Sequence, residues 1–225
     1  MKNLLTQYKD LFSKKRFLAN AAISFLYLIS SLIIYTYAAQ YATVSASNSV
    51  TDIVLSNTRV YNVDGFFVFG GLGLVLIMWT IVLTHPKRIP FALKTIALFV
   101  IIRSIFISLT HIGPFPTEVI FDRSTIHYAH EIIGKTAFKA FFSGDDLFFS
   151  GHTGLPFLMA YIYWDTKWIR YMFICFSICF GIIVLLGHLH YSIDVLAAFF
   201  IVYSIFNIAK NLFKKDYEKE FPVLK

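Results

Sequence analysis

Six long apolar runs constrain this chain more than any other feature. A helix that crosses a bilayer needs about 17–25 mainly apolar residues. Hydrophobic residues make up 57% of the 225 residues and charged residues only 15%, whereas an ordinary soluble domain is about 45–50% apolar. The sequence therefore predicts an all-α integral membrane protein with six transmembrane helices in one bundle. The six runs are approximately Phe17–Ala38, Phe66–Leu83, Phe91–Ile112, Leu147–Trp164, Tyr171–Leu186 and Tyr191–Ile208.

Lys and Arg residues flank these runs unevenly. About fifteen of them lie on the side of the two termini, whereas the other side has only Arg59, Arg123, Lys135 and Lys139. The side with more cations is usually cytoplasmic, so we expect both termini in the cytoplasm. The net charge of +7 follows from this flanking and does not indicate a nucleic-acid partner. The predicted organisation is a cytoplasmic N-terminal segment (1–16), a six-helix transmembrane domain (17–208) and a basic cytoplasmic tail (209–225).

The first apolar run has a competing interpretation as a signal peptide cleaved after Ala46. Its apolar region is about twice the usual 7–15 residues of such a peptide. A retained helix is therefore the favoured prediction.

Several polar residues that interrupt or border the runs fall at a similar depth in the membrane. His152 falls at the outer end of the fourth run, and His190 and Asp194 fall at the outer end of the sixth. Arg103 lies inside the third run, nearer its outer half. Titratable groups at membrane depth are costly and commonly functional, so this gathering predicts a site below the outer surface.

The segment "HYSID" contains His190 and Asp194 four residues apart. On a helix this spacing places both side chains on one face. A carboxylate there can fix the imidazole tautomer and leave the second ring nitrogen available for nucleophilic attack or proton transfer. The alternative is a structural pair at a helix start, in which the two side chains only satisfy each other's hydrogen-bonding groups.

The segment "SGHT" has the features of a helix start that binds an anion. Ser150 is a typical N-cap, Gly151 allows a close approach of the backbone, and His152 falls in the first turn. Free N–H groups and the helix dipole at such a start favour a phosphate oxygen. The alternative is an ordinary cap with an incidental histidine.

Arg103 stands in the middle of "IALFVIIRSIFISL", too far from the inner end to reach it easily. A planar guanidinium is suited to bidentate phosphate binding. The alternative is a structural ion pair with Asp194 or Asp146.

The loop "IHYAHE" contains residue types that can bind a metal. His127, His130 and Glu131 lack a recognised set of further ligands at metal-binding spacing. A solvated amphipathic segment explains them better. No metal and no cofactor are expected.

Two motifs resemble those of a known family of membrane enzymes. "DLFFSGHT", which starts at Asp146, and "HYSIDV", which starts at His190, resemble the paired motifs of the type-2 phosphatidic acid phosphatase superfamily. The closer similarity is to its sphingomyelin synthase branch. An earlier motif of that branch is echoed by Arg103 and Thr110 in "RSIFISLTHIGPFP", although the prolines align poorly.

The chain also departs from the ordinary lipid phosphatases of this superfamily. They carry a Lys-x6-Arg-Pro motif and an Arg six residues before the second-motif histidine. This chain lacks the first motif and has Val184 at the second position. The resemblance therefore favours the synthase-like branch over simple phosphate-monoester hydrolysis.

The resemblance implies a phosphohistidine-type mechanism that needs no metal. His190, oriented by Asp194, would attack the phosphorus of a phospholipid and displace a diacylglycerol-like alcohol. His152 would protonate the leaving oxygen and then act as base for the incoming hydroxyl. One imidazole must be neutral and the other protonated, which a residue with an ordinary pKa of about 6.5 can provide.

The remaining candidate residues are expected to bind substrate. Arg103, Ser150 and Gly151 would hold the developing phosphoryl charge. Asp146 would orient His152 or attract a cationic headgroup such as choline. Tyr191 would stack on the headgroup, and the alternative is a simple anchor at the membrane interface.

These expectations describe an enzyme of the cell (plasma) membrane with its active site on the outer face. Its partners would be the bilayer, a phospholipid donor and a lipid alcohol acceptor such as ceramide. A lipid phosphatase that uses water as acceptor is the alternative within the superfamily. A small transporter or scramblase with a polar intramembrane path is an alternative of another class, but the sequence lacks the paired halves typical of transporters. A haem or metal membrane protein is a third alternative. The sequence leaves the headgroup, the acceptor and the oligomeric state open.

Overall fold

The protein is helical in every part that the structure describes. The computed structural model describes residues 3–116 and 147–220, and these two ranges contain no β-strand. The predicted all-α class is therefore confirmed for them. The helices are α1 (Leu4–Phe12), α2 (Lys15–Ser45), α3 (Ile53–Ser56), α4 (Asp64–Thr84), η1 (Pro86–Arg88), α5 (Ile89–Thr110), α8 (Gly151–Ile162), α9 (Lys167–Leu186), α10 (Ser192–Leu212) and α11 (Lys214–Glu220).

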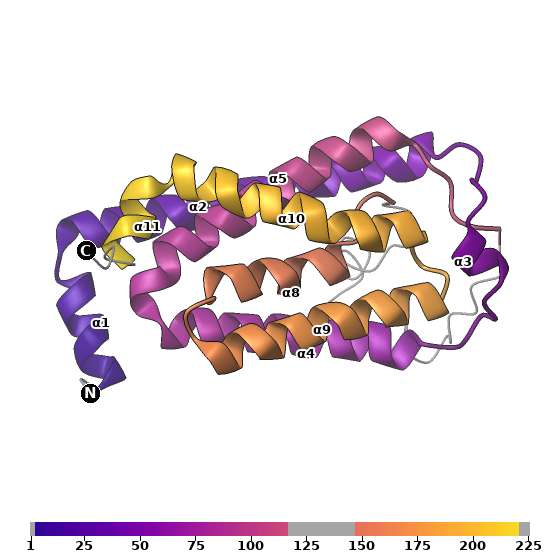
Figure 1. Cartoon of the computed structure of the whole chain (residues 1–225). Helices are drawn as coiled ribbons and strands as arrows, with labels where there is room; N and C mark the ends of the chain where they lie inside the picture. Colours follow the sequence, from indigo (N-terminus) through magenta and orange to yellow (C-terminus); the bar gives the residue numbers. More distant parts are fainter. Residues whose placement is uncertain (1–2, 117–146, 221–225) are drawn as a thin grey trace.

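The long helices lie lengthwise beside one another in an elongated bundle (Figure 1). The first and last described helices, α1 and α11, lie at one end of this bundle, and we call it the terminal end. The short helix α3 lies at the opposite end, which we call the α3 end. Helix α10 begins at the α3 end and runs toward the terminal end (Figure 1).

Five described helical segments are long and apolar enough to cross a membrane. They have 20 to 31 residues and mean hydropathies of 1.9 to 2.5. This finding supports an integral membrane protein, and the five segments correspond to the first, second, third, fifth and sixth predicted runs. They are Lys15–Ser45, Asp64–Thr84, Pro86–Thr110, Lys167–Leu186 and Ser192–Leu212.

The fourth predicted run gives a shorter helix than expected. Helix α8 has 12 residues, which corresponds to about 18 Å at 1.5 Å per residue. A bilayer core is about 30 Å thick, so the prediction of six spans is not confirmed.

Helix α8 lies inside the bundle, in contact with α4, α5, α9 and α10. Leu158 and Met159 have no exposed surface. A Cβ atom at Gly154 would stand 3.1 Å from the Phe99 ring and 3.2 Å from Val202, so the glycine allows α5 and α10 to approach α8 closely. A helix that is apolar on all sides is expected in such a central position.

Helix α2 packs along α5 through small side chains. Its buried face includes Ala21, Ser24, Ser31, Ala38 and Ala42. Small residues let two helix backbones approach closely, which drives helix association in membranes where burial of apolar surface does not. The predicted first span is thus part of the bundle.

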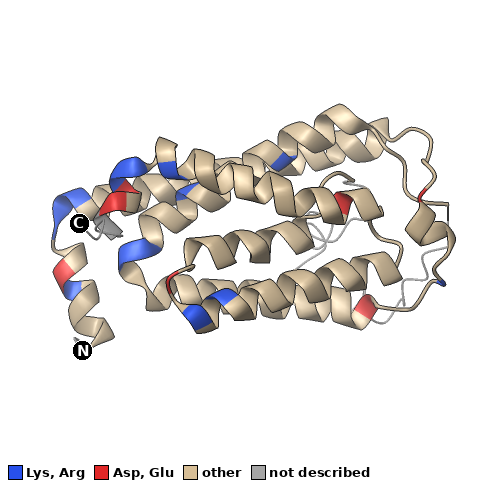
Figure 2. Cartoon of the chain, viewed as in Figure 1, with Lys and Arg blue, Asp and Glu red and all other residues tan. Residues whose placement is uncertain are grey.

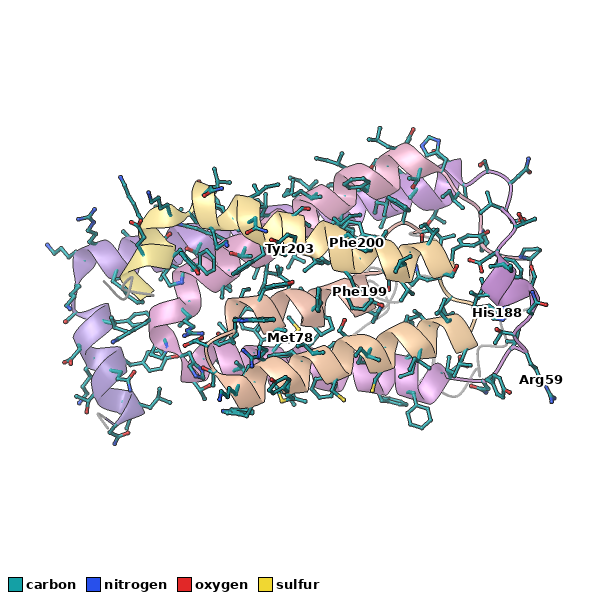
Figure 3. All side chains as sticks on the ribbon, viewed as in Figure 1. Arg59, Met78, His188, Phe199, Phe200 and Tyr203 are labelled. Carbon is teal, nitrogen blue, oxygen red and sulfur yellow. The ribbon has the colours of Figure 1, made fainter. Side chains whose placement is uncertain are left out.

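Large apolar side chains cover the outside of the bundle. Phe200 is 68% exposed and Tyr203 is 55% exposed, whereas Met78 is only 6% exposed. Figure 3 shows Phe200 and Tyr203 on helix α10. An apolar outer surface of this kind suits acyl chains and not water.

The charges gather at the terminal end, as Figure 2 shows for Lys and Arg. There, Lys94 Nζ lies 2.7 Å from Asp216 Oδ2 and donates to Asn20 Oδ1 over 2.7 Å. Asp216 belongs to α11, so part of the predicted tail packs onto the bundle. The side of the membrane on which this end lies stays a prediction.

Candidate active site at the α3 end

His190 and Asp194 form a buried pair at the start of α10. The Nδ1 atom of His190 lies 3.3 Å from Oδ2 of Asp194, and Asp194 has no exposed surface. The two residues do not share one helix face, because α10 begins at Ser192 with Tyr191 as its N-cap. Asp194 Oδ2 also accepts the Tyr191 backbone N–H over 3.1 Å, and this reach back over the helix start brings the carboxylate to the imidazole.

The pairing decides which ring nitrogen of His190 is available for chemistry. Nδ1 faces the carboxylate, so Nε2 points away from it. In the tautomer in which Nδ1 carries the proton, Nε2 carries the lone pair. The other carboxylate oxygen, Asp194 Oδ1, is buried and has no hydrogen-bond partner among the described residues.

The two sequence motifs meet through a backbone hydrogen bond. The Ser150 N–H donates to the Asp194 carbonyl oxygen over 3.1 Å. Ser150 is also the N-cap of α8, as predicted, because its Oγ accepts the Thr153 N–H over 3.4 Å. The starts of α8 and α10 are therefore in direct contact, although the two motifs lie about forty residues apart in the sequence.

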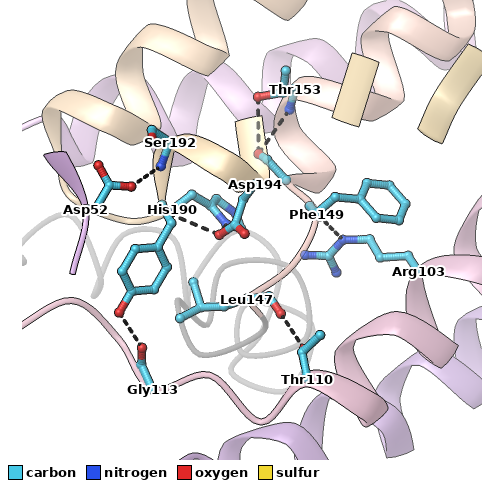
Figure 4. A network of polar contacts seen from close by, with 12 residues as sticks. Asp52, Arg103, Thr110, Gly113, Leu147, Phe149, Thr153, His190, Ser192 and Asp194 are labelled. Atoms are coloured by element: carbon cyan, nitrogen blue, oxygen red, sulfur yellow. Dashed lines mark hydrogen bonds and ion pairs between the residues drawn. The ribbon is translucent and has the colours of Figure 1, made fainter. Parts of the chain in front are cut away.

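Arg103 reaches the start of α8 from helix α5. Its Nε donates to the Phe149 carbonyl oxygen over 3.1 Å, and its Nη1 donates to the Tyr35 Oη over 2.9 Å. Arg103 is 6% exposed, and Figure 4 shows its guanidinium between Phe149 and the His190–Asp194 pair. Because Tyr35 belongs to α2, this geometry includes the helix that a signal-peptide interpretation would remove.

Gly151 leaves room for this arginine. A Cβ atom at this position would stand 3.1 Å from Arg103 Nε and 3.4 Å from Cζ. The backbone at the start of α8 and the guanidinium therefore lie against each other. Both favour an anion, one through free N–H groups and the helix dipole and the other through its charge.

His152 lies in the first turn of α8 with its ring against aromatic side chains of α4 and α9. The ring centroids of His152 and Phe67 are 4.4 Å apart, and those of His152 and Phe180 are 6.0 Å apart. The imidazole is thus held at the start of the same helix whose cap contacts α10.

The segment that leads into α8 has a strained backbone. Phe148 has a φ of 78°, a left-handed conformation that is costly for a bulky residue. Thr110 Oγ1 holds the segment by donating to the Leu147 carbonyl oxygen over 3.2 Å. Figure 4 shows this contact beside the Arg103–Phe149 bond.

Asp52 is a contributor that the sequence analysis missed. Its Oδ2 accepts the Ser192 N–H over 2.7 Å, and its Oδ1 accepts the Val54 and Leu55 N–H groups over 2.8 and 3.0 Å. Burial raises the pKa of the Asp52 carboxyl, but the N–H donors outweigh burial and hold the pKa below its ordinary value. "TDIVL" suggests an N-cap for α3, but its contact with α10 arises only in the folded chain.

Tyr191 is buried between loops of the α3 end. Its Oη donates to the Gly113 carbonyl oxygen over 2.8 Å and accepts the Val50 N–H over 3.2 Å. Burial raises the pKa of the Tyr191 hydroxyl. These contacts tie the loops to the start of α10, while its predicted stacking on a headgroup stays a prediction.

The other histidines at this end contact the loops. His188, whose φ is 53°, has its Nε2 3.1 Å from the Thr58 carbonyl oxygen, and Figure 3 shows it near α3. His111 ends α5 in the left-handed conformation, and its buried Nε2 has no hydrogen-bond partner within residues 3–116 and 147–220.

Four of the residues considered from the sequence lie outside the described ranges. They are Asp146, His127, His130 and Glu131. Within the described ranges, no group of three or more His, Cys, Asp or Glu side chains is arranged to hold a metal.

Comparison with known proteins gives one match. The family model of the PAP2 superfamily C-terminal domain matches residues 144–212, a range that contains helices α8, α9 and α10 and both motifs that meet at their starts. This match supports membership of the PAP2 superfamily, which contains phosphatases and phosphotransferases. No curated protein and no solved structure matched the chain.

Proposed function

We propose that this chain is a membrane-embedded lipid phosphotransferase that moves a phospho-headgroup from a glycerophospholipid to a lipid alcohol such as ceramide. The hydrogen bond between the Ser150 N–H and the Asp194 carbonyl oxygen carries the proposal most directly. It unites the two motifs that the family match covers. The catalytic part is the domain of residues 17–208.

The first step uses His190 as the nucleophile. Its Nε2 lone pair attacks the phosphorus, a P–N bond forms, and the P–O bond to the diacylglycerol breaks. His152 gives its proton to the leaving oxygen. Asp194 stabilises the positive charge that develops on the imidazole, because its Oδ2 lies 3.3 Å from Nδ1.

The second step returns the enzyme to its starting state. His152, now neutral, takes the proton of the acceptor hydroxyl, whose oxygen attacks the phosphorus while the P–N bond breaks. Arg103 and the N–H groups at the start of α8 bind the phosphoryl oxygens in both steps, when the negative charge on them grows. With water as acceptor, the same residues would perform hydrolysis.

The orientation belongs to the proposal. Lys and Arg residues gather at the terminal end, and the positive-inside rule assigns such an end to the cytoplasm. The α3 end and its site then face outward in the plasma membrane. The donor and acceptor lipids would enter from the outer leaflet.

Headgroup transfer from purified protein tests the proposal. Fluorescent ceramide is supplied with phosphatidylcholine, phosphatidylethanolamine or phosphatidic acid, and the lipid products are separated. Wild-type protein should give a phosphorylated ceramide product from at least one donor, and His190→Gln and His152→Gln should each abolish it. His85→Gln is a matched control, because His85 contacts the Ile81 carbonyl oxygen at the end of α4.

Three outcomes would contradict parts of the proposal. Full activity of both site variants would exclude the two-histidine mechanism. Release of free phospho-headgroup without any ceramide product would identify water as the acceptor. A large loss of activity with chelator would indicate a metal.

A further inference from the structure

A pocket of about 310 Å³ lies at the terminal end, the opposite end of the bundle from the candidate active site. It is formed where the end of α1, the start of α2, η1 and the first turn of α5 meet α11. Its cationic residues are Lys14, Arg16 and Lys87, and its apolar residues are Leu11, Phe17 and Pro90. The pocket therefore combines positive charge with an apolar surface.

The three cations are available to a ligand. Lys14, Arg16 and Lys87 have exposed side chains, and no described residue forms an ion pair with them. Asp216 also lines the pocket, but Lys94 lies 2.7 Å from its carboxylate and balances its charge. The pocket is thus strongly positive.

Two helix starts add to the positive electrostatic potential of the pocket. Lys14 is the N-cap of α2, a helix of 31 residues, and no side chain caps it. Helix α5 begins at Ile89, with Pro90 in its first turn. The N-terminal ends of both helices carry partial positive charge, and both contribute residues to the pocket wall.

The position of the pocket relates it to the membrane surface. It lies at the ends of candidate spans α2 and α5. Beside it, α1 has Tyr8 bound to the Leu83 carbonyl oxygen over 2.7 Å. A site at this depth meets the headgroup layer, where basic pockets between helices bind acidic lipid headgroups.

We propose that this pocket binds the headgroup of an anionic phospholipid, with the phosphate on Lys14, Arg16 and Lys87 and the upper acyl region against Phe17 and Pro90. The volume is in the range of small-ligand pockets, about 300–1,000 Å³. The bound lipid would contact α1, α2, α5 and α11 together and would stabilise their packing. This lipid is a ligand and not a substrate, because the pocket is at the opposite end from His190.

Thermal unfolding of the full chain in neutral detergent micelles tests this proposal. The added probes are phosphatidylglycerol, phosphatidylcholine and inorganic phosphate, each titrated separately. Phosphatidylglycerol should raise Tm in a saturable manner, because a ligand that binds only the folded state stabilises it. Phosphatidylcholine and inorganic phosphate should give little shift.

Two triple variants separate the pocket from general surface charge. Lys14→Gln/Arg16→Gln/Lys87→Gln should weaken the apparent affinity for phosphatidylglycerol by about tenfold or more. The matched control is Lys9→Gln/Lys167→Gln/Lys215→Gln, which removes three exposed cations that lie outside the pocket. The control should change the affinity by less than about twofold.

Equal loss in the two triple variants would overturn the proposal, because it would show non-specific attraction. A saturating shift with inorganic phosphate that displaces the lipid would also overturn it and identify a soluble anion as the ligand. If the pocket triple variant fails to fold, Lys87→Glu provides the test, since Lys87 is exposed. Unchanged affinity in Lys87→Glu would exclude the pocket. None of these measurements depends on turnover.

Discussion

The two ends of the bundle treat buried polar groups differently. At the terminal end, Lys94, Asn20 and Asp216 form a closed set of side-chain contacts, each of 2.7 Å. At the α3 end, Asp194 contacts an imidazole at 3.3 Å and a backbone N–H at 3.1 Å, while its Oδ1 has no partner in the described ranges. The carboxylate of Asp216 has partners on both oxygens, and that of Asp194 has partners on one.

This difference separates groups that serve stability from groups that serve chemistry. A closed ion pair gives no further binding capacity, so its removal should affect folding alone. An incompletely satisfied carboxylate beside an imidazole is costly in a folded protein, and it is expected where a reaction needs it. Variants at the two ends should therefore fail in opposite ways.

The largest effect is expected for Asp194→Asn. The amide cannot stabilise a charged imidazole and favours the wrong tautomer, which lowers kcat by about 10⁴-fold in a serine protease with a similar His–Asp pair. We expect headgroup transfer to fall by about 10³–10⁴-fold, measured as the rate of ceramide product formation. Asp165→Asn, which alters the Arg88 pair at the terminal end, should leave the rate unchanged. Comparable losses in the two variants would contradict the division between the ends.

A large loss of stability is expected for Lys94→Met. It removes the cation that lies 2.7 Å from the mostly buried Asp216 carboxylate, and breaking a buried pair costs about 3–5 kcal/mol. The free energy of unfolding should fall by this amount in a reversible denaturation experiment in micelles, and activity per folded molecule should be retained. Lys94→Met/Asp216→Leu should recover most of the stability, because no unpaired charge remains. A double variant as unstable as the single one would show that packing, and not charge, dominates there.

Much of this arrangement could be predicted from the sequence. Apolar runs identified five long helices, because lipid exposure requires apolar side chains along the whole span. Ser150 could be recognised as an N-cap because capping is a local interaction. The fourth run could not be judged in this way, since a helix buried in a bundle and a helix exposed to lipid are both apolar. Its contacts with α4, α5, α9 and α10 and the close packing at Gly154 show that α8 is central.

The supporting contacts of the site could not be predicted. Tyr35 and Asp52 act on residues 68 and 140 positions away, and neither has a local pattern that identifies its partner. The spacing of His190 and Asp194 predicts their pairing, but the helix begins two residues later than His190. The pairing therefore depends on a cap geometry and not on helical periodicity.

A smaller effect is expected for Gly151→Ala. The new Cβ would stand 3.1 Å from Arg103 Nε, so the guanidinium must shift. Displacement of a binding group by a fraction of an ångström to one ångström can cost up to about 10²-fold in rate. We expect headgroup transfer to fall by about ten- to a hundredfold. Gly73→Ala is the control, because nothing lies within 4 Å of its Cβ position. Wild-type activity in Gly151→Ala would show that the contact with Arg103 is not needed.

The smallest effect is expected for Asp52→Asn, which replaces one of the two carboxylate oxygens by a group that cannot accept the Ser192 or Leu55 N–H. Asn can still cap α3, and loss of one hydrogen bond costs about 1 kcal/mol. Because the pKa of Asp52 in the folded chain lies below the ordinary value of 3.8, its stabilising contribution is present above that value and is lost as pH falls through the folded pKa. The difference in Tm between wild type and variant should therefore be largest at neutral pH and should shrink at pH below about 4. A constant difference across this range would indicate that the contact with Ser192 does not depend on the charge of Asp52. The start of α10 would then be positioned by packing and not by this charge.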